Sequence, residues 1–457
     1  MNTILLQPTD VLFFRDGRPM EGSLAGHGAA WPLPNVINAA FHAALHRASL
    51  EGVHEHRRGA RGTYAQDARR DRKFGSLQTA GPFPVSPDDT WFFPRPTDLQ
   101  DDSLNPALLP SQCDVFDQCS LPDVLEYAVA NRLPPSKESS ARPWLAGPAY
   151  QRYLEGDQST PAHGEAAKDV DFSDTEHGIG IAIDPDTGTT GQGEAAGKIY
   201  SAHYLRLREG WRLGAIGSAW DKANGSPASN RDLLTELLQS DQRIIVGGQQ
   251  RICSAKLASS GPLHLPRGLQ SEFHEREGKF LVKWVLLSPA VWPEIAAESK
   301  AGQSMTPHPG GWVPNWIHPQ TGDVLLRHRT GEVRRDYSGA KARRIADKED
   351  SIAARLVAAL TPKPIVVTGW ALPDAGGDTD AERNGGAQST HLAVPPGAVY
   401  YFEADSPDDA GKLAAALNWH GAEASPTTIK NRRSTLLGEK GFGLGVCGTW
   451  DFFENVR

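Results

Sequence analysis

The sequence has little of several features that would assign it to a class at once. It contains only four cysteines: Cys113, Cys119, Cys253 and Cys447. No C-x-x-C pair and no histidine at zinc-finger spacing accompanies them, so we expect buried thiols rather than disulfides or metal ligands. No run approaches the ~20 apolar residues that cross a bilayer, and the first ten residues lack the pattern of a signal peptide. We therefore expect a cytoplasmic protein with no membrane partner.

An excess of positive charge is also missing. The formal net charge is −8, which argues against a protein that grips nucleic acid alone through one broad basic face. A local site stays open, because basic residues gather at 54–73 and again at 327–344. Each stretch is equally compatible with a solvated loop.

The familiar catalytic and cofactor motifs are absent or fail on context. Gly443, Gly445 and Gly448 spell G-x-G-x-x-G, but only nine residues follow, too few for a dinucleotide-binding βαβ unit. No H-E-x-x-H or G-x-S-x-G is present. His42 and His46 share a helix face and could in principle seat a metal, yet no carboxylate accompanies them at fixed spacing. We expect no enzyme, no metal and no cofactor.

What the 457 residues do contain is a repeated order of elements, with 39% apolar and 22% charged content typical of a folded protein. In the first half we predict, in order, a strand at 3–7, a helix at 36–49 with Asn35 as its N-cap, strands at 179–183 and 199–207, a helix at 230–239, and a strand at 243–256 interrupted by Gly247-Gly248. This order is β-α-β-β-α-β.

The second half gives the same order again. The predicted elements are a strand at 280–287, a helix at 349–360, strands at 365–370 and 398–402, a helix at 408–417, and a strand at 442–450. We therefore predict an α+β fold of two ferredoxin-like (RRM-like) βαββαβ domains with long loop insertions. Residues 1–260 would form the first domain, with an insertion at about 52–174. Residues 261–457 would form the second, with a glycine-rich loop at 438–445.

Glycines beside cationic residues follow the second helix of each half. They lie at 247–251, with Arg251, and at 438–445, with Lys440. Glycine lets another backbone approach closely, which suits either a sugar-phosphate backbone or a packed neighbour within the protein. The sequence leaves both readings open.

A compact turn follows the first strand. Residues 12–20 read LFFRDGRPM, in which Gly17 can adopt a positive φ and Pro19 fixes the exit, so that Arg15 and Arg18 would be held in place. Phe13 and Phe14 face opposite sides of the strand, and we expect one to be buried and the other to contact a partner.

Residues 8–19, PTDVLFFRDGRP, resemble the N-terminal signature of the family of the third subunit of the Cmr complex, the type III-B CRISPR effector. Supporting matches are spread along the chain: WPLP at 31–34, GPF at 81–83, PRPTD at 94–98, GIGIAID at 178–184, KIY at 198–200, GG at 247–248, SPA at 288–290, GW at 369–370, VPPGAVY at 394–400 and the glycine-rich C-terminus. One departure is His177, since the family pattern has an arginine nearby.

The resemblance implies a noncatalytic RAMP-superfamily subunit that binds the 5′ repeat-derived tag of crRNA. It would dock on the large cyclase-type subunit and on the backbone RAMP subunits, and would not act as a homo-oligomer. Arg15 and Arg18 would pair with phosphates, and Trp31 or Phe442 could stack a base. The complete expected RNA-binding set is Arg15, Gly17, Arg18, His27, Trp31, Asn35, Gly247, Gly248, Arg251, Lys440, Gly441, Phe442 and Gly443. Two alternatives remain: a metal-independent crRNA-processing endoribonuclease, and a structural adaptor without RNA contact.

Overall fold

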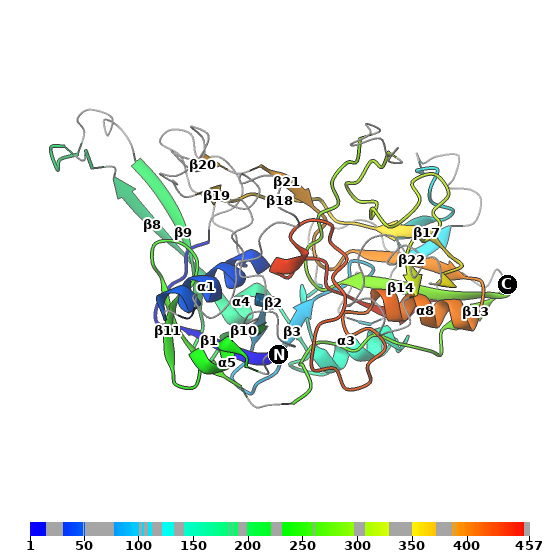
Figure 1. The fold of residues 1–457 in the computed structure, drawn as a ribbon, viewed down its shortest axis with the longest axis horizontal. Coiled ribbons are helices and arrows are strands. Elements are labelled where there is room, and N and C mark those ends of the chain that lie inside the picture. The colour runs from blue at the N-terminus through cyan, green and yellow to red at the C-terminus, as the bar shows by residue number, and fades with distance from the viewer. Residues whose placement is uncertain are drawn as a thin grey trace.

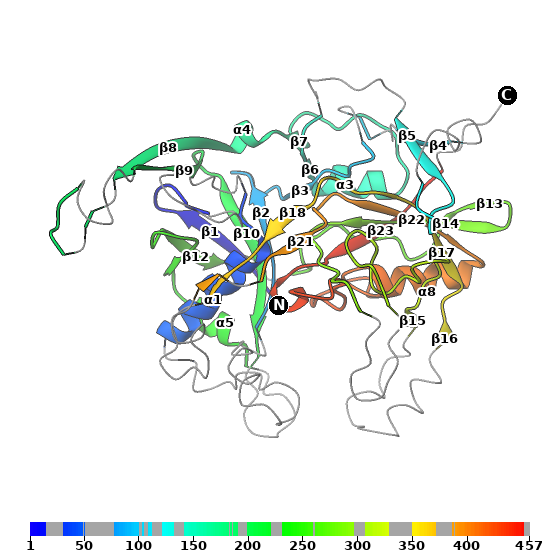
Figure 2. The ribbon, with the colours of Figure 1, turned by 90° about the horizontal axis from the view of Figure 1, so that it is seen from above.

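Two antiparallel sheets and few helices form the body of the molecule (Figures 1 and 2). The structure is a computed structural model. It describes residues 1–14, 31–48, 50, 77–99, 103–104, 108–111, 121–131, 141–181, 183–184, 186–190, 199–220, 231–258, 261–296, 307–328, 350–371, 386–387 and 389–451. In this part of the chain, no helix is both long enough and apolar enough to cross a membrane.

The first sheet has the strand order β11-β12-β1-β10-β2, and every neighbouring pair is antiparallel. Its strands are β1 (Asn2–Pro8), β2 (Leu77–Val85), β10 (Arg212–Ala219), β11 (Gln242–Ile245) and β12 (Ile252–Leu257). The helices α1 (Pro34–Arg47) and α5 (Leu233–Leu237) cover one face. Ile4 and Leu6 point to these helices and Leu5 points away, because alternate residues of a strand face opposite sides.

The second sheet has the order β13-β14-β22-β17, and β23 also pairs with β14. Its strands are β13 (His274–Arg276), β14 (Lys279–Leu286), β17 (Ala354–Leu360), β22 (Val399–Ala404) and β23 (Gly445–Thr449). One face packs on α8 (Pro407–Leu417), where Trp284 and Leu413 are fully buried. Ser406 caps α8, because its side chain accepts a hydrogen bond from the Asp409 N–H.

The sheet faces away from the helices share one hydrophobic core. Leu5 of β1 and Val285 of β14 belong to the same buried cluster, together with Tyr150 and Tyr153 of α3 (Gly147–Leu154). Each fully buried apolar side chain of this kind contributes about 1.5–3 kcal/mol to folding. The two halves therefore form one packed body rather than two beads on a linker.

Smaller elements surround this body. A three-stranded sheet is formed by β3 (Phe92–Pro94), β6 (Trp144–Ala146) and β7 (Ala166–Ala167). Two-stranded pairs are β4 (Leu108–Ser111) with β5 (Ala128–Asn131), β15 (Arg327–His328) with β16 (Asp350–Ser351), β18 (Ile365–Val367) with β21 (His391–Ala393), and β19 (Trp370–Ala371) with β20 (Gly386–Ala387). The described residues also form the short helix α4 (Asp169–Phe172) and the 3-10 turn η4 (Gly438–Lys440).

A long hairpin projects from the body. It consists of β8 (Ser173–Ile181) and β9 (Ile199–Leu207), which pair with each other along their whole length and reach outward in both views (Figures 1 and 2). Ile179 is 79% exposed on it. The predicted strands at 179–183 and 199–207 thus exist but were wrongly placed in the main sheet.

The second and third strands along the chain in the first sheet are β2 and β10 instead. β2 lies within the range 52–174 that the sequence assigned to an insertion. Its sequence, LQTAGPFPV, carries two prolines and a glycine, which usually argue against a sheet strand. It is accepted because β2 is an edge strand, paired only with β10.

The helix predicted at 349–360 is wrong, because Ala354–Leu360 is the strand β17, paired with β22. Alanine and leucine favour helix in isolation. Here Leu356 is buried on the side of α8 and Val357 in the shared core, so burial on both faces overrides that preference. The strand predicted at 365–370 also lies outside the main sheet, since Ile365–Val367 pairs with β21.

Two helix starts needed correction. Leu33, not Asn35, occupies the N-cap of α1, and it makes no side-chain cap hydrogen bond. Pro34 begins the helix, since its fixed φ suits the first helical position. Asn35 lies in the first turn, and its buried Oδ1 has no hydrogen-bond partner. The helix predicted at 230–239 is shorter, Leu233–Leu237, and is capped by the Asp232 carboxylate.

Candidate functional site

The end of the first strand packs against the turn between β11 and β12. Gly248 N–H donates to the carbonyl of Phe13 at 2.8 Å, and Leu12 exchanges two backbone hydrogen bonds with Leu205 of β9. Gly247 has φ +79°, and a Cβ there would overlap the Phe13 carbonyl. Glycine is therefore required at 247 so that this turn can reach the strand end.

Charged and aromatic side chains gather beside this contact. Arg206 forms ion pairs with Asp10 (3.0 Å) and with Glu176 across the hairpin. Arg251 lies 3.5 Å from the other oxygen of Asp10, and its guanidinium is 5.0 Å from the centre of the Tyr204 ring. We call Asp10, Phe13, Tyr204, Arg206, Gly247, Gly248 and Arg251 the strand-end cluster.

The cluster is ordered by its own charges. The Val11 N–H, followed by Arg206 and Arg251, keeps the pKa of Asp10 below its usual value. The two arginines are matched by the carboxylates of Asp10 and Glu176, so the described part carries little net charge. Arg15, Gly17 and Arg18 follow Phe14 directly in sequence but, like His27, lie outside the described residues.

Of the two neighbouring phenylalanines Phe13 and Phe14, one is buried and one is partly exposed, as the strand pattern predicted. Phe14 is 3% exposed and belongs to the core under α1. Phe13 is half-buried, and its ring centre lies 5.6 Å from that of Tyr204. Phe13 is thus the one of the two with ring surface near solvent.

The C-terminal glycine-rich loop is packed inside the protein. Phe442 is fully buried among apolar residues, so the hypothesis that it stacks an RNA base is incompatible with this placement. Gly441 fits under the Thr79 carbonyl of β2, and a Cβ on Gly443 would overlap Ser434. Lys440 is half-buried at the end of η4. Of the two readings left open by the sequence, these contacts favour a packed neighbour.

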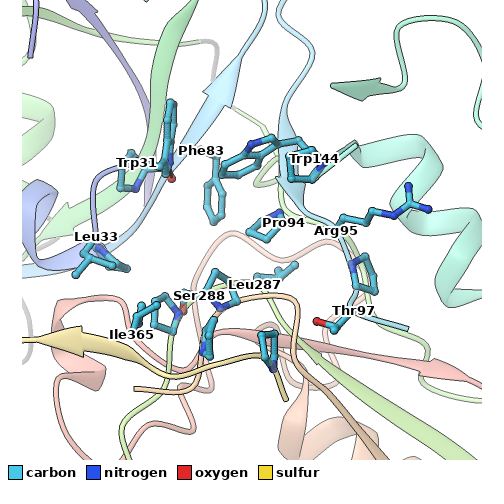
Figure 3. A pocket seen from close by; sticks show the side chains of 18 of the residues that line it. Trp31, Leu33, Phe83, Pro94, Arg95, Thr97, Trp144, Leu287, Ser288 and Ile365 are labelled. Atoms are coloured by element: carbon cyan, nitrogen blue, oxygen red, sulfur yellow. Dashed lines mark hydrogen bonds between the residues drawn. The ribbon is translucent and has the colours of Figure 1, made fainter. Parts of the chain in front are cut away.

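Trp31 lies in a different place from the strand-end cluster. Its indole N–H donates to the Pro82 carbonyl at 3.0 Å, and its ring meets Trp144 and Phe172 edge-on at 5.4 and 5.3 Å between centres. Trp31 forms part of the wall of a cavity of about 800 Å³ between the two halves (Figure 3). Asn35 lies nearby in the first turn of α1, with Oδ1 buried.

The cavity is walled by segments that are far apart in sequence. They are residues 31–34, 81–83, 94–97, 287–289, 362, 364–366 and 395–396, with single residues from other parts of the chain. Eleven of its 25 lining residues are prolines. Thr97 of one wall uses both N–H and Oγ1 to donate to the Gly397 carbonyl beside the opposite wall, each at 2.9 Å. We call this space the proline-lined cavity.

Next to the cavity wall lies a buried polar network that the sequence did not reveal. Asp98 is fully buried and accepts hydrogen bonds from Tyr153 (2.8 and 2.9 Å) and Tyr401 (3.1 Å). Lys283 of β14 is 1% exposed, donates to the Tyr153 carbonyl, and has its Nζ 3.5 Å from the centre of that ring. Burial lowers the pKa of Lys283 to about 8, against the opposing charge of Asp98.

The histidine and cysteine side chains in the described part of the chain form no metal-binding cluster. Among the described residues, no group of three or more His, Cys, Asp or Glu side chains could hold a metal ion. His42 and His46 do lie side by side on α1, with ring centres 4.5 Å apart. Cys253 and Cys447 are buried free thiols, as expected, and burial raises the pKa of Cys253 to about 12.

Sequence reasoning missed Tyr204 and Arg206, which complete the strand-end cluster. Both lie on β9, whose Leu205 exchanges backbone hydrogen bonds with Leu12 and so brings them beside Asp10, although they are almost 200 residues away in sequence. The only available clue was the alternation of polar and apolar residues in 199–207, which identifies a strand but not its neighbours.

Comparisons with known proteins place the chain in a family. A family model described as CRISPR-associated protein (Cas_Cmr3) matches residues 4–450. No curated protein matches the sequence. Among solved structures, a chain of the type III-B Cmr-beta complex bound to cognate target RNA is 12% identical, with TM-score 0.35, 87% of this chain covered and 86% of that one. A chain of the Csm3-Csm4 subcomplex of a type III-A CRISPR-Cas interference complex is 9% identical, with TM-score 0.34, 88% and 92% covered.

These similarities differ in weight. The structural likenesses are distant, whereas the family match runs over nearly the whole chain, including the strand-end cluster and all walls of the proline-lined cavity. The chain belongs to the Cmr3 family of CRISPR-associated proteins, which are subunits of type III effector complexes.

Proposed function

We propose that this protein is a noncatalytic subunit of a type III-B effector complex that binds the 5′ repeat-derived tag of crRNA. The strand-end cluster carries this proposal. It fixes the backbone of residues 10–13, shortly before Arg15 and Arg18 in the sequence, and its own charges are already paired. Arg15 and Arg18 would then be the cations that bind the phosphates of the RNA.

Base recognition would use ring surface at the same place. Phe13 and Tyr204 are both half-buried and lie against each other beside Arg251. Single-stranded RNA is recognised mainly by stacking and by backbone contacts, and one stacked base contributes ~1–3 kcal/mol. We therefore propose that Phe13 and Tyr204, rather than Phe442, stack a base of the RNA tag.

Two ferredoxin-like domains are part of the proposal. In each unit the last strand pairs with the first, as in a ferredoxin-like sheet. The strand orders are β12-β1-β10-β2 and β23-β14-β22-β17, which supports this common plan. In the second unit β17 supplies the second strand, but no helix among the described residues lies between β14 and β17, so its resemblance to the plan is less complete. In the complex the subunit would contact the large cyclase-type subunit and the backbone RAMP subunits.

The test uses the assembled complex loaded with a guide RNA that carries photoreactive nucleotides in its 5′ tag. We expect crosslinks to peptides that contain residues 10–18 or 247–251. Replacing Arg15 and Arg18 together by alanine should weaken them at least about tenfold, since each lost charged contact costs ~1.5–3 kcal/mol. Arg243→Ala is the matched control, because Arg243 is exposed on neighbouring β11.

Two outcomes would overturn the proposal. Tag crosslinks that never reach this subunit would indicate an adaptor without RNA contact. Cleavage of repeat RNA by the purified chain, abolished by replacing one histidine, would indicate a processing endoribonuclease.

A further inference from the structure

We infer that the proline-lined cavity receives an uncharged, apolar segment of a neighbouring protein subunit, and not RNA. This inference rests on the proposed function only in that the chain works within a multi-subunit complex. It assigns a separate surface with a different kind of partner.

The chemistry of the wall argues against nucleic acid. Proline has no backbone N–H, and eleven of the 25 lining residues are prolines. Their main chain cannot donate to phosphate oxygens or to base edges. Only Arg95 and Asp169 carry charge among the lining residues.

Both of those charged groups are already engaged by the protein. Arg95 donates to the carbonyls of Leu99 (3.4 Å) and Ser103 (3.0 Å), and its guanidinium points away from the cavity (Figure 3). Asp169 accepts the indole N–H of Trp144 at 2.7 Å. A polyanion entering here would lose hydration without gaining a cation.

The same wall offers apolar contact on several sides. Trp31, Phe83, Trp144 and Ile365 surround the space, on elements from both halves of the chain (Figure 3). Aromatic side chains of this kind are enriched at the centres of protein–protein interfaces, whereas charged residues are depleted there. Since the two charged side chains of the wall are already engaged by the protein, the complementary occupant is an uncharged apolar segment.

A small polar metabolite fits the wall less well than a protein segment. Small-molecule sites carry a few polar groups that fix the orientation of the ligand. Here the Thr97 hydroxyl is bound to Gly397, and Ser288 Oγ accepts the Leu444 N–H at 2.9 Å. Recognition would therefore rest on shape and apolar area.

The cavity is also held open by contacts that do not depend on an occupant. Thr97 binds Gly397 across the halves, Trp31 binds Pro82, and Asp98 anchors the adjoining wall through Tyr153 and Tyr401. A preformed site lowers the ordering cost of binding. This favours a docking pocket over a gap that closes in solution.

The test places a photoreactive benzoylphenylalanine at Val366, which lines the cavity and is partly exposed, in the full complex with its guide. The matched control carries the probe at Leu325, which is 53% exposed and outside the cavity wall. We expect the Val366 probe to crosslink to one apolar peptide of another subunit, and the Leu325 probe not to label that peptide. Crosslinks to RNA, or no protein crosslink from Val366, would overturn the inference.

A charge placed in the cavity gives an independent measurement. Val366→Glu should weaken binding of the crosslinked subunit at least about tenfold, an interface hot-spot effect, while Leu325→Glu should change it less than about twofold. Val366→Ala serves if the glutamate variant does not fold. Equal affinities for all variants would refute the inference. Crosslinks from the RNA tag, measured in the same samples, report separately on the proposed function.

Discussion

Replacing Lys283 by methionine tests whether the buried charges between the two sheets act as a unit. The change keeps the length of the side chain and removes its charge beside Asp98. Lys283 has a pKa of about 8, so at pH 7 it carries a proton. Breaking a buried pair from one side typically costs 3–5 kcal/mol. We expect Lys283→Met to reduce the free energy of unfolding by up to that amount, because burial already raises the pKa of Asp98 and uptake of a proton there offsets part of the loss.

The reverse change should cost less. With Asp98→Asn, Lys283 can lose its proton. Because pH 7 is only one unit below the pKa of Lys283, removing that proton costs ~1.4 kcal/mol. We therefore expect a loss of ~1–2 kcal/mol. The double variant has no buried charge left without a partner. We expect its free energy of unfolding to lie within ~1–2 kcal/mol of that of the parent, since neutral replacement of a whole buried pair is well tolerated.

The assay is urea unfolding of the three variants and the parent at pH 7, followed by tryptophan fluorescence. A double-mutant cycle then gives the coupling between the two side chains. Two results would refute the reasoning: a loss below ~1 kcal/mol for Lys283→Met, or single effects that simply add in the double variant.

Three further predictions concern acid stability, the C-terminal loop and the strand-end turn. Burial, then Arg267, lowers the pKa of His420 from 6.5 to about 4, so the unfolded chain binds more protons than the folded one between these pH values. The free energy of unfolding should therefore fall by up to ~3 kcal/mol from pH 6.5 to 4. If His420→Gln lost as much stability as the parent over this pH range in urea melts, the prediction would be wrong. Phe442→Ala should cost ~3–5 kcal/mol in the same melts and leave tag crosslinks intact, whereas lost crosslinks at unchanged stability would restore its role in stacking. Gly247→Ala should destabilise more than Gly188→Ala, because both have positive φ but only the first Cβ meets backbone; equal unfolding midpoints would exclude that contact.

The elements predicted well were those whose period agreed with their surroundings. β1, β14 and α8 carry apolar residues at strand or helix spacing, and each packs the face that the spacing indicates. β17 failed because its composition favours helix while both of its faces are buried in a sheet. Such a conflict is settled by tertiary contacts, which no local window contains.

The candidate site divides in the same way. Local composition identified Gly247 and Gly248 as a place of close backbone approach, and the structure brings them to Phe13 of the same chain, while their contact with RNA stays a prediction. Arg206 and Tyr204 were missed, because their place depends on the pairing of a hairpin far along the chain. Phe442 was misjudged for a related reason: its neighbouring glycines suggested an exposed loop, but they permit close packing.

The short motifs that carried the family resemblance separate into two surfaces with different chemistry. The segment at 8–19 begins in the strand-end cluster, beside arginines and aromatic rings. The motifs at 31–34, 81–83, 94–98, 288–290 and 394–400 all reach the proline-lined cavity, where charge is scarce and main-chain donors are few. A surface that attracts phosphate needs cations, and one that buries apolar side chains excludes them. RNA binding and subunit docking should therefore be lost independently of each other. Arg15→Ala with Arg18→Ala should leave binding of the neighbouring subunit unchanged, and Val366→Glu should leave crosslinks to the RNA tag unchanged. If either variant disrupted both, the two surfaces would have to be treated as one composite interface.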